Sequence, residues 1–289
     1  MEQTTVFLHQ GSIGDCWASI PAMKEYHRKT GKKITLYLVN GIKAFYYENA
    51  IHPTVNSSGE QVMLNETVIN MMIPLFKAQP FIADCKVWSN QPVHVDLGKI
   101  RETDVNMPYG DLRKWYFYVY PDTQCDVSKP YIEVPDTDKD FAKGKIIVTR
   151  SERYLNPLIK YHFMKRYEED ILFVGTDLEY QIFQLRYGLH VGHLKINDFL
   201  ELAQALKQCK FHVSNQTQAF QISEGLKIPR ILEVCRFAPN VEPIGENGYG
   251  FYAQEALEYY VAVLNGETLK AQQGGLPVVI NIPKSLGVK

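Results

Sequence analysis

Residues 5–23, which read TVFLHQGSIGDCWASIPAM, decide the class of fold that this chain can form. The stretch begins with a short apolar segment that ends before Gly11, as expected of a buried strand in a parallel sheet. Apolar residues then recur at a helical spacing of three, and Pro21 must lie in the first turn of this helix or kink it. A second strand is predicted at 34–39, so the N-terminus forms one strand–helix–strand unit.

The rest of the chain repeats this alternation, more regularly in its second half. In the first half we expect a helix at 65–77 and short strands at 86–88 and 93–95. In the second half we expect strands at 146–149, 171–174, 211–213 and 230–234, and helices at 161–168, 177–187, 197–209, 218–226 and 252–264. Strands and helices in this order predict an α/β fold with mainly parallel sheets covered by helices.

A proline-containing, acidic segment at 130–140 has the composition of a linker. It divides the chain into an expected N-terminal Rossmann-like domain, residues 1–140, and an expected C-terminal Rossmann-like domain, residues 141–265. A tail of residues 266–289 contains the apolar run 278–280, for which the sequence indicates no place. Two such domains are expected to face each other across a cleft at the carboxyl ends of their strands.

Composition argues against several classes of protein. Hydrophobic residues make up 45% of the 289, so a sizeable core can form. The net charge is -1, which argues against binding nucleic acid by bulk charge. No apolar run approaches the length of an integral membrane segment, and the N-terminus lacks a signal-peptide pattern, so we expect a cytoplasmic protein. The five cysteines form no Cys-x-x-Cys pair and indicate neither a zinc site nor a disulfide framework.

The loop between the first strand and the first helix is the first candidate site. It presents backbone amides and a helix N-terminus, a geometry that favours anions. It has neither the Gly-Lys-Ser/Thr of a Walker loop nor the spacing of a dinucleotide-binding fingerprint. Asp15, at the start of the helix, either caps the helix or faces the cleft as a functional carboxylate. The residues alone leave both interpretations open.

The pattern SIGD, five further residues and then PAM resembles the opening of the heptosyltransferase family, glycosyltransferase family 9. The match falls on Gly14, Asp15, Pro21 and Ala22. The resemblance implies the GT-B fold, in which two Rossmann-like domains face each other and the C-terminal one holds most of a nucleotide-sugar. It also implies that Asp15 is the general base of an inverting transfer, in which an attacking hydroxyl must lose its proton.

A segment of the C-terminal half resembles the family's strand and glycine turn beneath the nucleotide. It reads LFVGT, residues 172–176, and is followed by a predicted helix. Gly175 and Thr176 are therefore expected to bind the donor. Gly14 is expected to contact the donor from the opposite wall of the cleft. Glu179 is interpreted as the partner of Thr176 in a capping box.

A second segment, VSNQT at residues 213–217, resembles the family's final nucleotide-binding unit. Asn215 is expected to bind there or to cap the next helix, and Gln216 and Thr217 are expected to offer amides or side chains to the diphosphate. The family has Asp-Thr-Gly and then a histidine at this place, whereas this chain has Asn-Gln-Thr and Phe220. Donor contacts therefore differ, and an ADP-heptose donor is not implied.

The departing diphosphate gains negative charge and needs donors or a cation. Arg150 and Ser151 follow the strand 146–149 directly and are the best candidates, since arginine can hold phosphate with two donors. A surface position is the alternative for Arg150. Glu224, and after it Glu233, lie where enzymes of the GT-B fold often bind ribose hydroxyls, with a solvated carboxylate as the alternative for both.

Two patterns suggest a metal without predicting one. Asp136-Thr137-Asp138 has the D-x-D spacing of a metal site but lies among prolines in the presumed linker. His190 and His193 have no third ligand nearby. We therefore expect no metal and no cofactor, with a nucleotide-diphosphate sugar as co-substrate.

The sequence as a whole favours a metal-independent, inverting glycosyltransferase. Its donor is a nucleotide-sugar, and its acceptor is a glycan, a lipid-linked glycan or a modified nucleic acid. Two alternatives remain open: a nucleotide-sugar epimerase or hydrolase of the same fold, and a non-catalytic nucleotide-sugar-binding protein.

Overall fold

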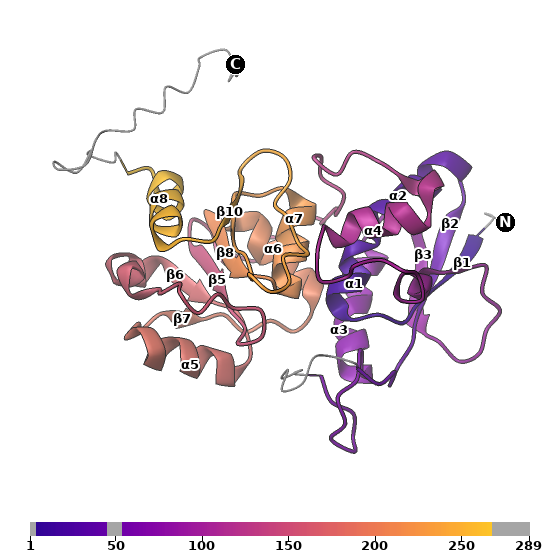
Figure 1. Ribbon diagram of the computed structural model, residues 1–289, viewed down its shortest axis with the longest axis horizontal. Coiled ribbons are helices and arrows are strands. Elements are labelled where there is room, and N and C mark those ends of the chain that lie inside the picture. The colour runs from indigo at the N-terminus through magenta and orange to yellow at the C-terminus, as the bar shows by residue number, and fades with distance from the viewer. Residues whose placement is uncertain (1–3, 45–53, 268–289) are drawn as a thin grey trace, which may run out of the picture.

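Two separate parallel sheets organise the computed structural model, which describes residues 4–44 and 54–267 (Figure 1). The first sheet has the order β3-β2-β1-β4. Its strands are β1 (Thr4–His9), β2 (Lys33–Leu38), β3 (Ile82–Val87) and β4 (Val95–Asp96). The second has the order β10-β9-β8-β5-β6-β7. Its strands are β5 (Ile146–Thr149), β6 (Ile171–Phe173), β7 (Gly192–His193), β8 (Phe211–Asn215), β9 (Arg230–Glu233) and β10 (Gly248–Phe251). All of these strand pairs are parallel, which confirms the predicted α/β class.

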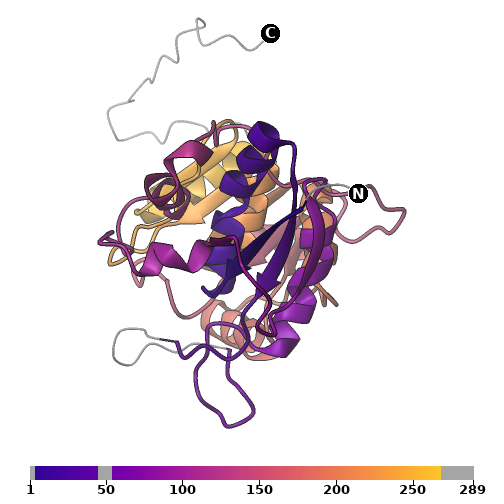
Figure 2. The same cartoon turned by 90° about the vertical axis from the view of Figure 1, so that its right-hand side faces the viewer.

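The helices lie around the two sheets, and the halves sit side by side along the long axis of the molecule (Figures 1 and 2). The α-helices are α1 (Ile13–Ala18), α2 (Ile20–Thr30), α3 (Glu66–Lys77), α4 (Leu112–Val119), α5 (Asp177–Tyr187), α6 (Phe199–Gln208), α7 (Gln218–Leu226) and α8 (Gln254–Asn265). The 3-10 helices are η1 (Leu97–Arg101), η2 (Pro121–Thr123) and η3 (His162–Asp170). None of the helices in the described part of the chain is long and apolar enough to cross a membrane.

The single helix predicted after the glycine loop is two helices. α1 ends at Ala18, and Ser19 is both its C-cap and the N-cap of α2. Pro21 then lies in the first turn of α2, as predicted, because a residue without an N–H loses nothing there. Gly31 ends α2 in the left-handed conformation.

Other differences between prediction and structure concern short or glycine-rich elements. No strand is predicted where the structure has β7, which has two residues, or where it has β10, which reads GYGF. The helical segment predicted at 161–168 is the 3-10 helix η3. The apolar run 278–280 lies outside the described residues.

The two halves share one apolar core. Helix α1 packs on α7, and α3 packs on α6. Trp17 of α1 is fully buried, stacks on Phe76 at 4.6 Å between ring centroids and meets Phe199 of α6 edge-on at 5.8 Å. Large buried aromatic rings contribute strongly to packing energy. The helices of the two halves therefore pack against each other as helices within one hydrophobic core do.

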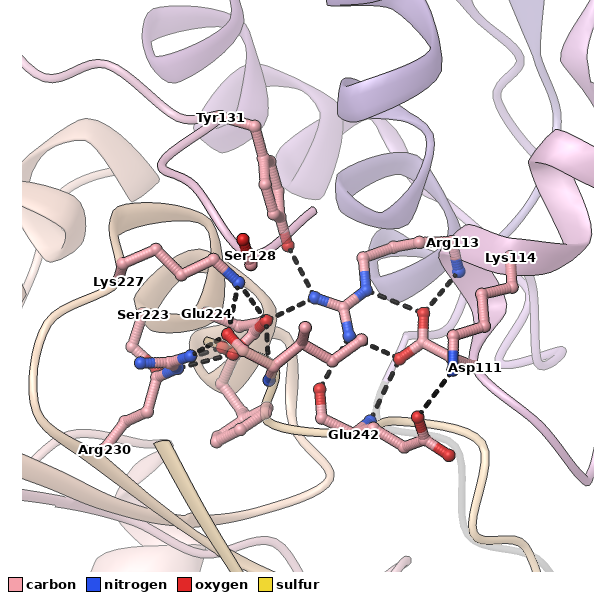
Figure 3. A network of polar contacts seen from close by, with 12 residues as sticks. Asp111, Arg113, Lys114, Ser128, Tyr131, Ser223, Glu224, Lys227, Arg230 and Glu242 are labelled. Carbon is pink, nitrogen blue, oxygen red and sulfur yellow. Dashed lines mark hydrogen bonds and ion pairs between the residues drawn. The ribbon is translucent and has the colours of Figure 1, made fainter. Parts of the chain in front are cut away.

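A buried ionic network also joins the halves (Figure 3). Arg113 of α4 donates from Nε to Asp111 Oδ1 at 2.7 Å and contacts Glu224 of α7 through Nη1. Glu224 also pairs with Lys227 and Arg230. The side chains of Arg113, Asp111 and Glu224 are at most 1% exposed. Such a network satisfies its charges only in one arrangement of α4 against α7.

Arg113→Met is expected to lower the free energy of unfolding by about 3–5 kcal/mol, because it leaves Asp111 buried without a cationic partner and removes the contact of Glu224 with the N-terminal half. Lys114→Met is the matched control. Lys114 pairs with Glu242 at an exposed position, and such a pair contributes about 0–1 kcal/mol. Urea unfolding of both variants measures the difference. Equal effects of the two substitutions would contradict this role of Arg113.

Candidate active site

A cavity of about 1090 Å³ lies between the halves, at the carboxyl ends of both sheets. From the N-terminal half it is lined by the loop after β1, the start of α1 and one side of α3. From the C-terminal half it is lined by the loops after β5, β6, β8 and β9. Ligands of open parallel sheets bind at this edge. The cavity is large enough for a nucleotide-sized molecule.

Asp15 lines this cavity from the first turn of α1 and is 3% exposed. Its Oδ2 accepts from the backbone N–H of Ser12 at 2.8 Å and from Arg101 Nε at 3.2 Å. With the Ser12 side chain it completes a capping box. Its Oδ1 accepts no hydrogen bond from any of the described residues. Asp15 therefore caps the helix and also presents one carboxylate oxygen for chemistry.

His9, at the end of β1, holds the loop that precedes Asp15 in place. The backbone N–H of Gly11 donates to His9 Nδ1 at 3.0 Å, and His9 Nε2 lies 2.8 Å from the hydroxyl of Tyr116. A Cβ on Gly11 would lie 2.6 Å from Asp15 Oδ2, so the close approach of loop and carboxylate requires glycine. A Cβ on Gly14 would meet only Ser12 Oγ at 3.9 Å. Gly14 thus leaves the cavity wall open beside Asp15.

The electrostatics keep Asp15 ionised. Burial raises the pKa of this carboxyl, but the charge and hydrogen bond of Arg101, with smaller contributions from His9 and Ser12, outweigh burial and leave the pKa below its ordinary value. Burial lowers the pKa of neighbouring His9 to about 4. At neutral pH the site therefore holds a carboxylate beside an uncharged imidazole.

The N-terminus of α7 lies on the opposite wall, and Thr217 is its N-cap. The Thr217 hydroxyl lies 2.9 Å from Ser214 Oγ and 3.3 Å from Thr149 Oγ1. Thr149 Oγ1 in turn lies 2.9 Å from Nε2 of buried His212. The helix N-terminus and this hydroxyl cluster supply donors suited to an anion. Thr217, and not Asn215, is the cap of α7.

Gln216 lines the cavity while its side chain holds the loop after β9. Its Oε1 accepts from the backbone N–H of Cys235, and its Nε2 donates to Ala238 O at 2.7 Å and to Asn240 Oδ1 at 2.9 Å. The carboxamide of Gln216 therefore shapes the cavity wall.

Arg150 and Ser151 both line the cavity, but their environments differ. Arg150 is buried and donates from Nε and Nη2 to Glu233 at 2.9 and 3.1 Å. Its guanidinium also lies over the ring of Tyr161. Ser151 is held by Asn215, whose Oδ1 accepts from the Ser151 N–H at 3.0 Å and whose Nδ2 donates to the Ser151 carbonyl at 2.9 Å. Arg150 is thus neither a free surface residue nor a cation without a partner.

The structure places three of the expected donor-binding residues outside the cavity lining. Asn215 is fully buried beneath Ser151 and positions that loop. Glu224 is fully buried in the ionic network that joins the halves, and Glu233 is fully buried against Arg150. A carboxylate surrounded by arginine and lysine side chains has no free face for a ribose. We therefore correct Glu224 from a ribose ligand to a residue of the interface, and Glu233 is not solvated.

Gly175 and Thr176 lie at the start of α5 and line the cavity. Thr176 and Glu179 form the predicted capping box, with the Thr176 N–H donating to Glu179 Oε2 at 2.9 Å. A Cβ on Gly175 would lie 2.7 Å from Cε1 of Phe173, so only glycine fits there. The N-termini of α5 and α7 thus both open on the cavity.

The two metal-like patterns lie elsewhere on the surface. Asp136 is exposed and pairs with Lys207. His193 stacks on Tyr180 at 4.1 Å between ring centroids, and His190 is exposed. Within residues 4–44 and 54–267, no cluster of three histidine, cysteine or acidic side chains could hold a metal ion.

Sequence reasoning missed several polar residues of the cavity, among them Arg101, Gln218 and Gln221. Arg101 is 86 positions from Asp15, and nothing in the sequence connects the two. Gln218 and Gln221 lie at i and i+3 on the predicted helix 218–226, so helical periodicity after the VSNQT segment could have placed them on one face.

The sequence matches no protein-family model, and no curated protein matches it. Its structure is similar to those of three bacterial glycosyltransferases. ADP-heptose LPS heptosyltransferase II of E. coli is 9% identical with a TM-score of 0.57, over 90% of this chain and 98% of that one. E. coli heptosyltransferase WaaC with ADP is 10% identical with a TM-score of 0.57, over 91% and 100% of the two chains.

The third is the glycosyl transferase family 9 protein of Veillonella parvula DSM 2008. It is 11% identical with a TM-score of 0.50, over 93% of this chain and 92% of that one. The likenesses cover both halves and confirm the GT-B-like arrangement of two facing parallel sheets. At this identity they show the fold alone, and the activity has to be argued from the site.

The two buried histidines of the site predict how stability depends on pH. Burial lowers the pKa of His9 to about 4 and that of His212 to about 3, from an ordinary value of 6.5. Below pH 6.5 the unfolded chain therefore binds protons that the folded chain does not. The free energy of unfolding should fall by about 1.4 kcal/mol per pH unit for each histidine between pH 6.5 and 4.

Urea unfolding at pH 7, 6 and 5 measures this slope. His212→Gln should reduce the slope by about half, because one of the two contributions is removed. His190→Gln, at an exposed position, is the matched control. A slope that is the same in wild type and His212→Gln would contradict the assignment.

Proposed function

We propose that this chain is a glycosyltransferase that transfers a sugar from a nucleotide-sugar to an acceptor hydroxyl, with inversion and without a metal, and that Asp15 is the general base. The observation that carries the proposal is the Asp15 carboxylate, ionised and with Oδ1 available, on the wall of a cavity between two facing parallel sheets. A protein that only binds nucleotide-sugars has no use for such a group. The shared fold with heptosyltransferases supports the same reading.

The acceptor hydroxyl attacks the anomeric carbon and gives its proton to Asp15 Oδ1 as the bond to the diphosphate breaks. A carboxylate within hydrogen-bond reach of the hydroxyl accelerates this step by general base catalysis. One displacement at the anomeric carbon, from the side opposite the leaving group, inverts the configuration.

The leaving diphosphate is stabilised from the opposite wall. The N-termini of α5 and α7 open on the cavity, and the Thr217 and Thr176 hydroxyls lie at these ends. Backbone N–H groups at helix N-termini favour phosphate oxygens and are already oriented. Arg150 lines the same wall, with its guanidinium paired to Glu233. The backbone at Ser151 is held in place by Asn215. These donors are the reason for proposing a reaction that needs no metal.

We propose the donor and the acceptor as chemical classes and not as particular molecules. The donor is a nucleotide-diphosphate sugar, and the acceptor is a glycan, a lipid-linked glycan or a modified nucleic acid. A cytoplasmic location, expected from the sequence, is part of the same proposal.

Asp15→Asn should keep the affinity for nucleotide-sugar and lower kcat by about 10²–10⁴-fold, because asparagine can still cap α1 but cannot accept the proton. The assay uses a panel of UDP-, GDP- and ADP-sugars, with binding measured by calorimetry and turnover by release of the nucleoside diphosphate. Asp136→Asn, a surface carboxylate, is the control. Full turnover by Asp15→Asn would remove the base assignment, and a wild-type protein that binds no member of the panel would refute the function.

Arg101→Met should move the acidic limb of kcat/KM to higher pH. In the wild type Arg101 holds the pKa of Asp15 below its ordinary value of 3.8, so the base stays ionised through the mildly acidic range. Without Arg101, burial dominates and the pKa of Asp15 rises above that value. Lys99→Met, an exposed position on the same 3-10 helix, is the control. If the acidic limb of kcat/KM lies at the same pH in Arg101→Met and Lys99→Met, Arg101 does not set the protonation of the proposed base.

A further inference from the structure

Two glutamine side chains on α7 have no hydrogen-bond partner among the described residues. Gln218 and Gln221 lie three residues apart in the first half of the helix and both line the cavity. Their Oε1 atoms are shielded from solvent and accept no hydrogen bond from the described residues. Gln221 is only 3% exposed. Buried amide oxygens are almost always hydrogen-bonded in folded proteins, so this pair indicates a partner that comes from a ligand.

The chemistry of a carboxamide limits what that partner is. An amide oxygen needs a donor, and an ionised diphosphate offers acceptors alone. A hydroxyl group both donates and accepts, so it satisfies a carboxamide in either orientation of its oxygen and nitrogen. The two Oε1 atoms are therefore suited to a neutral, hydroxyl-rich group and unsuited to the phosphates.

The position of the pair along α7 agrees with this chemistry. Thr217 and the helix N-terminus, where we place the diphosphate, immediately precede Gln218. Helix α7 packs on α1, whose first turn carries Asp15, and all of these residues line one cavity. In a nucleotide-sugar, the unit between the diphosphate and the attacking hydroxyl is the sugar that is transferred.

We propose that Gln218 and Gln221 bind hydroxyl groups of the transferred sugar and select the sugar by them. The inference rests on the proposed function, since it requires a nucleotide-sugar in this cavity. It adds a sugar-recognition surface formed by two neutral amides, next to the donors that hold the diphosphate. A sugar that lacks the contacted hydroxyl leaves an amide unpaired, which weakens binding of that sugar.

The test compares two ligands on two variants. Gln218→Met and Gln221→Met keep the length of the side chain and remove the amide. Calorimetry measures the affinity for the nucleotide-sugar that binds best among UDP-glucose, UDP-N-acetylglucosamine, GDP-mannose and ADP-glucose, and for the matching UDP, GDP or ADP. We expect each variant to bind the nucleotide-sugar about tenfold to a hundredfold more weakly and the nucleoside diphosphate as tightly as wild type.

Stability separates a ligand-binding role from a structural one. Neither amide has a hydrogen-bond partner to lose among residues 4–44 and 54–267, so the urea midpoint of each variant should equal or exceed that of wild type. Gln181→Met, at an exposed position on α5, is the control for both measurements. A lower midpoint would indicate that the amides serve the fold.

The remaining outcomes distinguish this inference from the function itself. Equal loss of affinity for sugar-bearing and sugar-free nucleotide would place the amides on the nucleotide and overturn the inference. Unchanged affinity for both ligands would overturn it too. In either case a wild-type protein that transfers sugar keeps the proposed function intact. A wild-type protein that binds none of the four nucleotide-sugars overturns both.

Discussion

The contact of Arg113 with Glu224 determines how the two halves of the molecule lie against each other. One residue comes from α4 and the other from α7, and neither is exposed to solvent. Removing two charges from water is costly, so the pair adds little stability compared with an apolar contact. The charges of Arg113 and Glu224 are both satisfied only in one arrangement of the two helices. This requirement fixes α7 against the N-terminal half. The apolar contacts of Trp17 then supply the packing.

The cavity follows from this arrangement, because its walls belong to different halves. Most polar groups that line it are already paired inside the protein. Arg150 pairs with Glu233, Gln216 holds the loop after β9, and Thr176 is in a capping box. Among the described residues, the lining groups that accept no hydrogen bond include one oxygen of Asp15 and the Oε1 atoms of Gln218 and Gln221. These are groups that hydroxyls satisfy, which agrees with sugar chemistry between the two walls.

Local sequence patterns predicted the order of elements and the class of the fold. The glycine loop, the capping box of Thr176 and the helix at 218–226 are local, and the structure has each of them. These local patterns could not predict which residues are buried or which residues far apart in the sequence pair with each other. Glu224 looks like a solvated or ribose-binding carboxylate until Arg113, 111 positions away, is placed beside it. Arg101 likewise meets Asp15 only in the folded chain, so the residue that lowers the pKa of Asp15 could not be found by reading along the sequence.

The configuration of the first-formed sugar product tests the account most directly. Time-resolved proton NMR of the anomeric signal follows a nucleotide-sugar during turnover, with either water or an acceptor glycan receiving the sugar. The proposed base on one wall and the proposed diphosphate site on the other predict a single displacement, so the first product should have the anomeric configuration opposite to that of the donor. A first product with retained configuration, or a donor that stays intact with every acceptor, would contradict the account.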